Sequence, residues 1–118
     1  MGHDQVTIIF PPFLLLGYWG SAPAPWLLIL SSAHRDNAAL IAHEQCHQSQ
    51  QRRDGTLRFW WRYATNKAWR LAYEVEAYKV WLDVQPLDAG KVGMWLCKNY
   101  GFDLKLSEAF ELLGVSHD

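Results

Sequence analysis

The chain has 118 residues, of which 50% are hydrophobic, and its formal net charge at pH 7 is −1. This length predicts one domain over residues 1–118, and the near-zero charge without a basic run argues against a nucleic-acid partner. The two cysteines, Cys46 and Cys97, are too few for a disulfide framework and no secretory leader precedes the apolar N-terminal stretch, so we expect a cytoplasmic location.

The N-terminal quarter of the chain is apolar but repeatedly interrupted. Between residues 6 and 30, prolines and glycines leave runs of about five apolar residues, whereas a membrane-spanning helix needs about 20. We therefore expect no transmembrane span, but strands over residues 6–10 (VTIIF) and 26–31 (WLLILS), with a third over residues 13–16. The density of aromatic residues keeps a role at a membrane interface open.

The sequence pattern turns helical after residue 32. Asp36 or Asn37 can cap a helix over residues 37–53, and Gly55 supplies its stop. Asn66 offers a fresh cap within the next helical region, and the later helical segments are predicted over residues 57–82, 89–99 and 107–113. Together these elements predict an α+β fold in which a short N-terminal β-sheet precedes a mainly helical core.

The first predicted helix carries the sequence His43-Glu44-Gln45-Cys46-His47. Residues four apart lie about 40° from each other around a helix axis, so His43 and His47 project side by side and can both bind one zinc ion. Glu44 lies next to this face and can take a proton from a water molecule that the metal activates. A plainer interpretation also fits these residues, in which both histidines belong to the core and Glu44 is solvated.

A catalytic zinc site has three protein ligands and a water molecule, so a third ligand is required. By residue type, the candidates are three histidines and two carboxylates of the next long helix: His3, His34, His117, Glu74 and Glu76. The two carboxylates lie about 200° apart around that helix, so both cannot face the same metal. Their plainer interpretation is ion pairing along the helix surface, Glu74 with Arg70 and Glu76 with Lys79.

The spacing of these motifs is similar to that of a known peptidase family. His43-Glu44-x-x-His47 is followed after 26 residues by Glu74-x-x-Ala77. This arrangement resembles the gluzincin metallopeptidases, in particular the Glu-x-Glu-Ala ligand helix of the membrane peptidases that process CaaX proteins and of the minigluzincins. The resemblance covers roughly half of the chain. It implies a zincin-like core, Zn²⁺ bound by His43, His47 and Glu74, and Glu44 as the general base that hydrolyses peptide bonds of a peptide or protein substrate.

Some positions leave alternatives open within this resemblance. We favour Glu74 over Glu76 as the third ligand, because Ala77 one turn later leaves room for close approach of the motif helix. The family often has an aspartate four residues after the ligand glutamate, where it orients a zinc histidine; this chain has Tyr78, which can form a hydrogen bond but supplies no carboxylate. The candidates for stabilising the oxyanion of the reaction are His34, Tyr63, Tyr73 and Tyr78.

The resemblance also implies a place for the substrate. In gluzincins the strand before the motif helix is the edge of a small sheet, and the substrate lies along it in extended form. By position, that edge strand consists of Trp26, Leu27, Leu28, Ile29, Leu30 and Ser31. Exposed amides at a sheet edge suit this role, because an added peptide strand gains affinity from main-chain hydrogen bonds.

An aromatic run is the other unusual feature of the sequence. Trp60 and Trp61 are adjacent, so a helix cannot bury both on one face, and we expect one of them to contact a protein partner, a membrane surface or another copy of the chain. The neighbouring arginines are expected to form a solvated face, with acidic substrate or membrane phosphates as the sharper alternative.

Two other functions compete with that of a zinc peptidase. A non-catalytic structural or binding protein could retain the fold and the metal, for example as a component of a larger assembly such as a phage particle, which would place it in the virion. A closed metal site favours that function, whereas an open fourth zinc position in a cleft favours the peptidase. The third function is that of a helical protein peripheral to a membrane, with a chance motif.

Overall fold

The computed structural model describes residues 5–10 and 20–115, and it confirms the predicted α+β fold with a small N-terminal sheet followed by helices. The strands are β1 (Val6–Phe10), β2 (Gly20–Ala24) and β3 (Leu27–Ser31). Their order in the sheet is β1-β3-β2, with β3 parallel to β1 and antiparallel to β2.

β3 is the central strand of this sheet, so the prediction that residues 26–31 form its edge is wrong. Leu28 and Leu30 of β3 are buried and, being two residues apart, lie on the same face of the strand. The strand beside it, β2, has the sequence GSAPA, whose low strand propensity hid it from the sequence pattern. The strand predicted over residues 13–16 lies outside the described residues.

Local capping residues divide the helical region that follows into α1 (Ala38–Asp54), α2 (Thr56–Thr65) and α3 (Lys67–Val84). The Asn37 side chain accepts a hydrogen bond from the backbone N–H of Leu40 at 3.0 Å, and the Asn66 side chain accepts one from Trp69 at 3.1 Å. Gly55 joins α1 to α2 with φ +88°, a conformation that glycine adopts without strain. Both predicted caps and the predicted stop are therefore confirmed.

Shorter elements flank these helices: η2 (Ser32–His34) before α1, and η3 (Pro86–Asp88), α4 (Ala89–Lys98) and α5 (Leu106–Leu113) after α3. Val92 and Leu96 of α4 and Ala109 of α5 are fully buried. A Cβ atom placed on Gly93 would lie 2.4 Å from a ring carbon of Phe110, so α4 and α5 pack closely at this point. The structure places both predicted C-terminal helices within one residue of their expected bounds.

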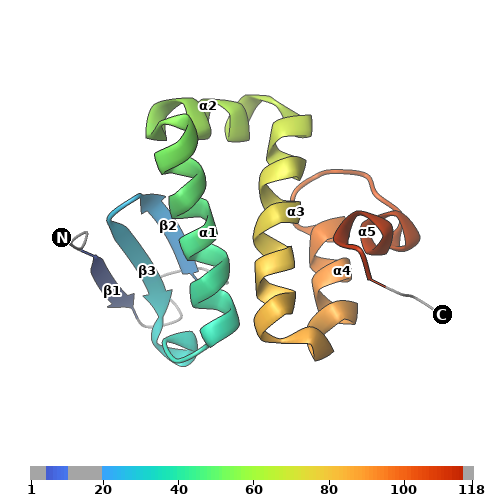
Figure 1. Cartoon of the computed structure of the whole chain (residues 1–118), viewed down its shortest axis with the longest axis horizontal. Coiled ribbons are helices and arrows are strands. Elements are labelled where there is room, and N and C mark those ends of the chain that lie inside the picture. The colour runs from blue at the N-terminus through green and yellow to red at the C-terminus, as the bar shows by residue number, and fades with distance from the viewer. Residues whose placement is uncertain (1–4, 11–19, 116–118) are drawn as a thin grey trace.

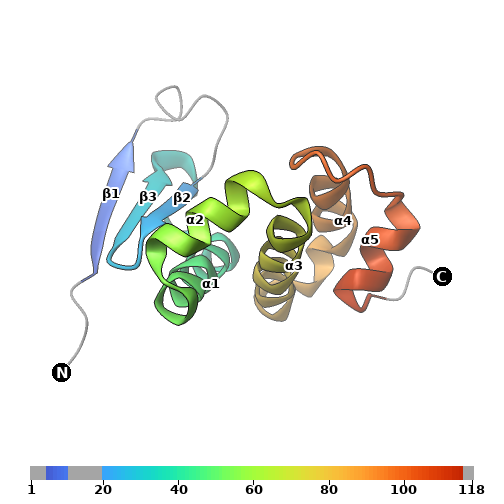
Figure 2. The ribbon, with the colours of Figure 1, turned by 90° about the horizontal axis from the view of Figure 1, so that it is seen from above.

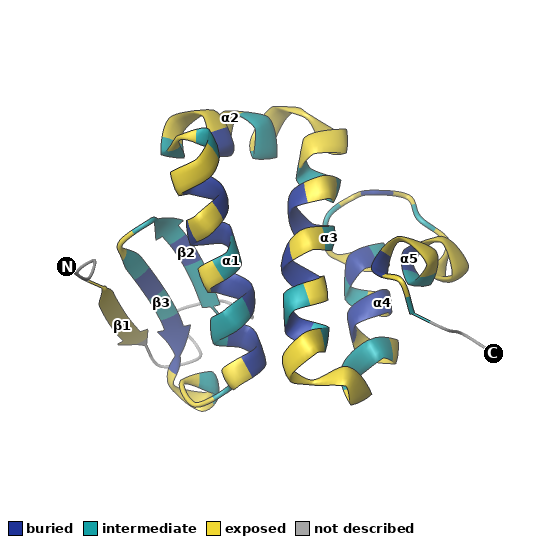
Figure 3. Ribbon diagram, in the orientation of Figure 1, coloured by how far each residue is buried: buried dark blue, intermediate teal, exposed yellow. Residues whose placement is uncertain are grey.

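The elements stack as layers across the molecule: the sheet, α1, α3, and then α4 with α5 (Figure 1). The view from above gives the same order and shows α2 connecting α1 to α3 at one end (Figure 2). Dark buried faces of α1 and α3 run along both helices in Figure 3, and these two helices form the most extensive contact between elements. Within residues 5–10 and 20–115, no helix is both long enough and apolar enough to cross a bilayer.

Candidate metal centre

The buried side of α1 is polar, which is unusual for a helix in the middle of a small protein. Six of its eight buried residues carry a polar side chain: His43, Glu44, His47, Gln48, Gln50 and Gln51. Two of the glutamines face the sheet, because Gln48 donates to the backbone carbonyl of Leu27 at 3.2 Å and Gln51 donates to that of Ala22 at 2.7 Å. Burial of polar groups is tolerated when they find partners, and these two bonds tie the sheet to α1.

The histidines of the motif converge on one carboxylate of α3. Glu74 Oε1 lies 3.3 Å from Nε2 of His43 and 3.2 Å from Nε2 of His47. All three residues are buried, with exposed fractions between 2% and 7%. One nitrogen or oxygen atom from each residue lies within 4.8 Å of the others, so the group could hold a metal ion.

Two of the three donor separations match the spacing expected around a small divalent ion. Donors that bind zinc at 2.0–2.1 Å with tetrahedral angles lie about 3.3–3.4 Å from one another. The two distances from Glu74 Oε1, 3.2 and 3.3 Å, agree with this spacing. The helical register explains how the site arises: His43 and His47 are one turn apart on α1, and α3 packs along the same face of α1.

Glu44 lies beside the three donors but is not part of the convergent group. Its side chain is buried, and its Oε2 atom lies 3.6 Å from the position that a Cβ atom on Gly20 would occupy. Burial raises the pKa of Glu44, although the neighbouring His43 and His47 oppose this increase. Gly20 of β2 therefore lies next to this carboxylate.

Charge coupling within the group favours an ionised Glu74. Burial acts to raise the pKa of Glu74, but His47 and His43 hold it well below its usual value. Burial acts to lower the pKa of His47, but Glu74 outweighs it and raises this pKa to about 9. Since a metal ligand must be the neutral imidazole, metal binding at neutral pH requires His47 to release a proton.

Gln50 supports His47 from behind, a role that the sequence did not reveal. The Nδ1 atom of His47 lies 2.7 Å from Oε1 of Gln50, so the amide oxygen accepts the ring N–H and leaves Nε2 free to bind a metal. The amide nitrogen of Gln50 in turn donates to the backbone carbonyl of Tyr73 at 2.9 Å and to Glu76 at 2.7 Å. A glutamine on a helix is by default solvated, so only the tertiary structure identifies it as part of the site.

Two of the tyrosine candidates also lie at the metal centre. The hydroxyl group of Tyr63 donates a hydrogen bond to Oε2 of Glu74, on the opposite oxygen from the histidines. The Tyr78 ring packs against the His43 ring with centroids 4.3 Å apart, and its hydroxyl group lies 2.6 Å from that of Tyr100. Burial raises the pKa of Tyr63 and of Tyr78, so both remain protonated donors at neutral pH. Tyr78 is therefore a direct neighbour of His43.

The alternative third ligand, Glu76, lies on a different side of α3. It is exposed, and both of its oxygens lie within hydrogen-bonding distance of Arg53, at 3.3 and 3.4 Å. The plainer alternative, a helix-surface pair of Glu74 with Arg70, is wrong, because Glu74 contacts the two histidines and Arg70 donates to the carbonyl of Tyr63 at 2.8 Å. Of the two carboxylates, Glu74 is the one that the structure brings to the histidines.

The remaining candidates lie apart from the convergent group. Tyr73 donates to Asp54 at 2.7 Å, and His34 lies in η2 ahead of α1. The role of His34 in stabilising an oxyanion stays a prediction. Cys46 is partly buried, and burial raises the pKa of its thiol to about 12, so it is not an activated thiolate. His3 and His117 lie outside the described residues.

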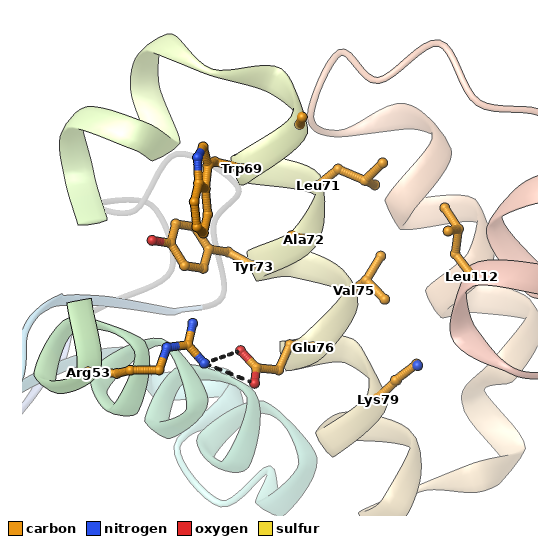
Figure 4. Close-up of a pocket in the computed structure, with 10 residues that line it drawn as sticks. Arg53, Trp69, Leu71, Ala72, Tyr73, Val75, Glu76, Lys79 and Leu112 are labelled. Carbon is orange, nitrogen blue, oxygen red and sulfur yellow. Dashed lines mark hydrogen bonds and ion pairs between the residues drawn. The ribbon is translucent and has the colours of Figure 1, made fainter. Parts of the chain in front are cut away.

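A cavity of about 580 Å³ lies on the other side of α3 from the metal centre. Figure 4 shows Trp69 and Tyr73 on one side of it, Leu71 and Val75 on the other, and the pair of Arg53 with Glu76 at its edge. None of the residues that line this cavity belongs to the convergent group or is Glu44. This cavity and the polar centre are therefore separate features of α3.

Two imidazoles and one carboxylate, with a second carboxylate nearby, form a donor set that can hold a divalent cation of the first transition row. The supporting hydrogen bonds fix the orientation of His47 and of Glu74, as expected around a metal. A search among models of protein families, curated proteins and solved structures found no match for this chain.

Proposed function

We propose that the protein is a zinc-dependent metallopeptidase of the gluzincin type. The observation that carries this proposal is the convergence of His43, His47 and Glu74 within a buried group that could hold a metal, with Glu44 next to it. Two imidazole nitrogens and a carboxylate oxygen are the ligand set of several catalytic zinc sites, and they favour Zn²⁺ over the hard cations that prefer oxygen alone.

A zinc ion bound here would supply Lewis acidity, which activates a water molecule and polarises the carbonyl group under attack. The chain's own residues would do the rest. Glu44 accepts the proton of the attacking water and passes it to the leaving amine. Gln50 holds His47 in the tautomer that leaves Nε2 free, and Tyr63 engages Oε2 of Glu74 so that Oε1 faces the histidines.

The substrate strand belongs at β2 in this proposal, rather than at β3 as first expected. β2 is an outer strand among the three described, and its residue Gly20 lies beside Glu44. Further along β2, the carbonyl of Ala22 in the middle of the strand accepts from Gln51 and that of Pro23 accepts from Trp60 at 2.9 Å, so those groups already have partners. We therefore place an extended peptide at the Gly20 end of β2.

A non-catalytic function is the second candidate, and the burial of the centre supports it. Glu44 and the three donors are each less than 8% exposed, and the large cavity lies elsewhere. A metal in such a closed site would act as a cross-link between α1 and α3. A structural component of a larger assembly, such as a phage particle, would need the metal for stability and not for turnover.

For the peptidase we propose a cytoplasmic location, and for the structural component the virion is the alternative. Cys46 and Cys97 are free thiols, which suits a reducing cytoplasm as well as a virion assembled in one.

Hydrolysis by zinc-loaded protein tests the first candidate against the second. Wild type and Glu44→Gln should be compared on a mixed peptide library, with products identified by mass spectrometry and zinc content measured in the same samples. We expect cleavage by wild type and a loss of about 100-fold or more in Glu44→Gln, which keeps its zinc. Zinc that raises the unfolding temperature of both proteins equally, with no cleavage by either, would instead establish the structural role.

A further inference from the structure

The exposed tryptophans of the protein gather at one end of the molecule. Among the residues that the structure describes, the exposed tryptophans are Trp26, Trp60, Trp61 and Trp69. They lie on the turn between β2 and β3, on α2 and in the first turn of α3, all at the end where α2 connects α1 to α3 (Figures 1 and 2). Hydrogen bonds from α2 and α1 to the β2–β3 segment join these parts, from Trp60 to Pro23 and from Arg52 to Pro25.

α2 has one face in the protein and one face in solvent. Phe59 is buried and Tyr63 reaches the metal centre, while Leu57 and Trp61, one turn apart, are 88% and 72% exposed. These exposed side chains are two residues from the inward ones, which places them about 200° away around the helix. The apolar outer face therefore does not contribute to the core.

The charge around this face is of one sign. Residues 55–73 contain Arg58, Arg62, Lys67 and Arg70 but no aspartate or glutamate. The acidic residues that flank this stretch already have partners: Asp54 lies 3.2 Å from Arg53 and 3.6 Å from Arg62, and Glu74 contacts His43 and His47. Arg58 and Lys67 are exposed, so their positive charge is available to a partner on the outside.

We propose that this end of the molecule, formed by α2 with Trp26 and Trp69 beside it, docks onto an anionic lipid surface. A short amphipathic helix with tryptophan and leucine outward and arginine and lysine around them is the pattern that lies in the interface of a charged bilayer. Its outer side chains enter the headgroup region, while the basic residues meet the phosphates. This docking is a further property of the protein and does not depend on the proposed peptidase activity.

The same charges argue against self-association through this surface. In a symmetric dimer, Arg58 and Lys67 of one copy would approach those of the other, and residues 55–73 offer no carboxylate to separate them. An anionic surface supplies the opposite charge without any further protein group. The observations therefore favour lipid over a second copy of this chain.

Vesicle flotation of the full-length chain tests the proposal. The probes are vesicles of phosphatidylcholine alone and of phosphatidylcholine with about 30% phosphatidylserine. The variants are Leu57→Asp and Arg58→Glu. Each has a matched control at the opposite end of the molecule: Leu87→Asp in η3, where the side chain is 93% exposed, and Lys91→Glu in α4, which is also exposed. All five proteins are first checked for native helical content by circular dichroism.

We expect wild type and both controls to float with the anionic vesicles and to remain behind with the neutral ones. Leu57→Asp and Arg58→Glu should each reduce binding by about tenfold or more, and about 0.5 M salt should reduce that of wild type. The proposal would be overturned if folded wild type did not bind anionic vesicles. It would also be overturned if the α2 variants and their controls bound these vesicles equally. A dimer in sedimentation analysis that Leu57→Asp dissociates, with no vesicle binding by wild type, would assign the surface to a second copy instead.

Discussion

α1 and α4 both pack against α3, yet they bury opposite kinds of side chain. The buried residues of α1 are mostly polar. Its glutamines donate hydrogen bonds to the sheet, and its histidines contact Glu74 of α3. The buried residues of α4 are Val92, Gly93 and Leu96, which fit against α5 and the remaining core. Specific hydrogen bonds and polar contacts therefore position α1, whereas close apolar packing positions α4.

This difference is one of energetic cost. Burying a polar group costs free energy unless a partner replaces the lost water, and several buried polar side chains of α1 have such partners. Among the described residues, the Nδ1 atom of His43 is buried without a hydrogen-bond partner, which is a local cost within the metal centre. α4 shows no such cost, and its contribution is that of an ordinary core helix.

The largest expected effect comes from removing a polar partner of α1. Glu74→Gln eliminates one of the three proposed protein ligands, so zinc affinity should fall on the order of a thousandfold or more. Glu76→Gln is the matched control two residues away, and zinc affinity should change little because the side chain faces Arg53 and the glutamine keeps an oxygen that accepts from Gln50. Isothermal titration with zinc measures both. An equal loss of zinc affinity in the two variants would contradict the assignment of Glu74, rather than Glu76, as a ligand.

A change of shape in α4 should act on stability and leave the metal alone. Gly93→Ala brings a methyl group to 2.4 Å from the Phe110 ring, and such overpacking costs about 1–3 kcal/mol. Gly90→Ala in the same helix meets nothing within 4 Å and should stabilise the protein by up to about 1 kcal/mol through helix propensity. Urea unfolding measures these changes. If Gly93→Ala also weakened zinc binding, the two regions would not be independent.

A smaller effect is expected from the support behind His47. Gln50→Ala removes the acceptor of the His47 ring N–H without removing a ligand, so zinc affinity should fall about 10- to 100-fold. Gln45→Ala on the exposed face of α1 is the control and should leave the affinity as it is. Competition with a fluorescent zinc chelator measures this range. A Gln50→Ala protein with wild-type affinity would remove Gln50 from the site.

The smallest effect on stability is expected at the exposed edge of the contact between α1 and α3. Arg53→Ala breaks the contact with Glu76, and since both side chains are about half exposed, the free energy of unfolding should change by less than about 1 kcal/mol. Unfolding in low and high salt measures it, and any change should shrink as salt screens the charges. A decrease of several kcal/mol in the free energy of unfolding would contradict this expectation and show that the pair stabilises the protein as strongly as a buried polar contact of α1.

The helices were predictable because their signals are local. Asn37, Gly55 and Asn66 set the ends of α1 and α3 through caps that depend on neighbouring residues, and the spacing of His43 and His47 follows from helix geometry. The convergence of Glu74 with them needed only that two adjacent helices pack face to face.

The errors arose where long-range contacts decide. The position of β3 between β1 and β2 depends on long-range pairing that no local pattern encodes, and the edge position of residues 26–31 was implied only by the resemblance to gluzincins. β2 forms from glycine, alanine and proline because β3 and α1 provide its partners. Gln50 gained its role from a neighbour on the same helix and from α3, and its residue type alone indicated a solvated position.

The most direct test of the metal centre is the position of the metal itself. Crystals of the zinc-loaded wild-type chain, with data collected on both sides of the zinc absorption edge, would locate the ion by its anomalous scattering. We expect one peak per chain, bonded to Nε2 of His43, Nε2 of His47 and Oε1 of Glu74 at about 2.0–2.2 Å. A zinc ion held at Cys46 or at the chain surface, with these three donors bonded only to one another, would contradict the assignment.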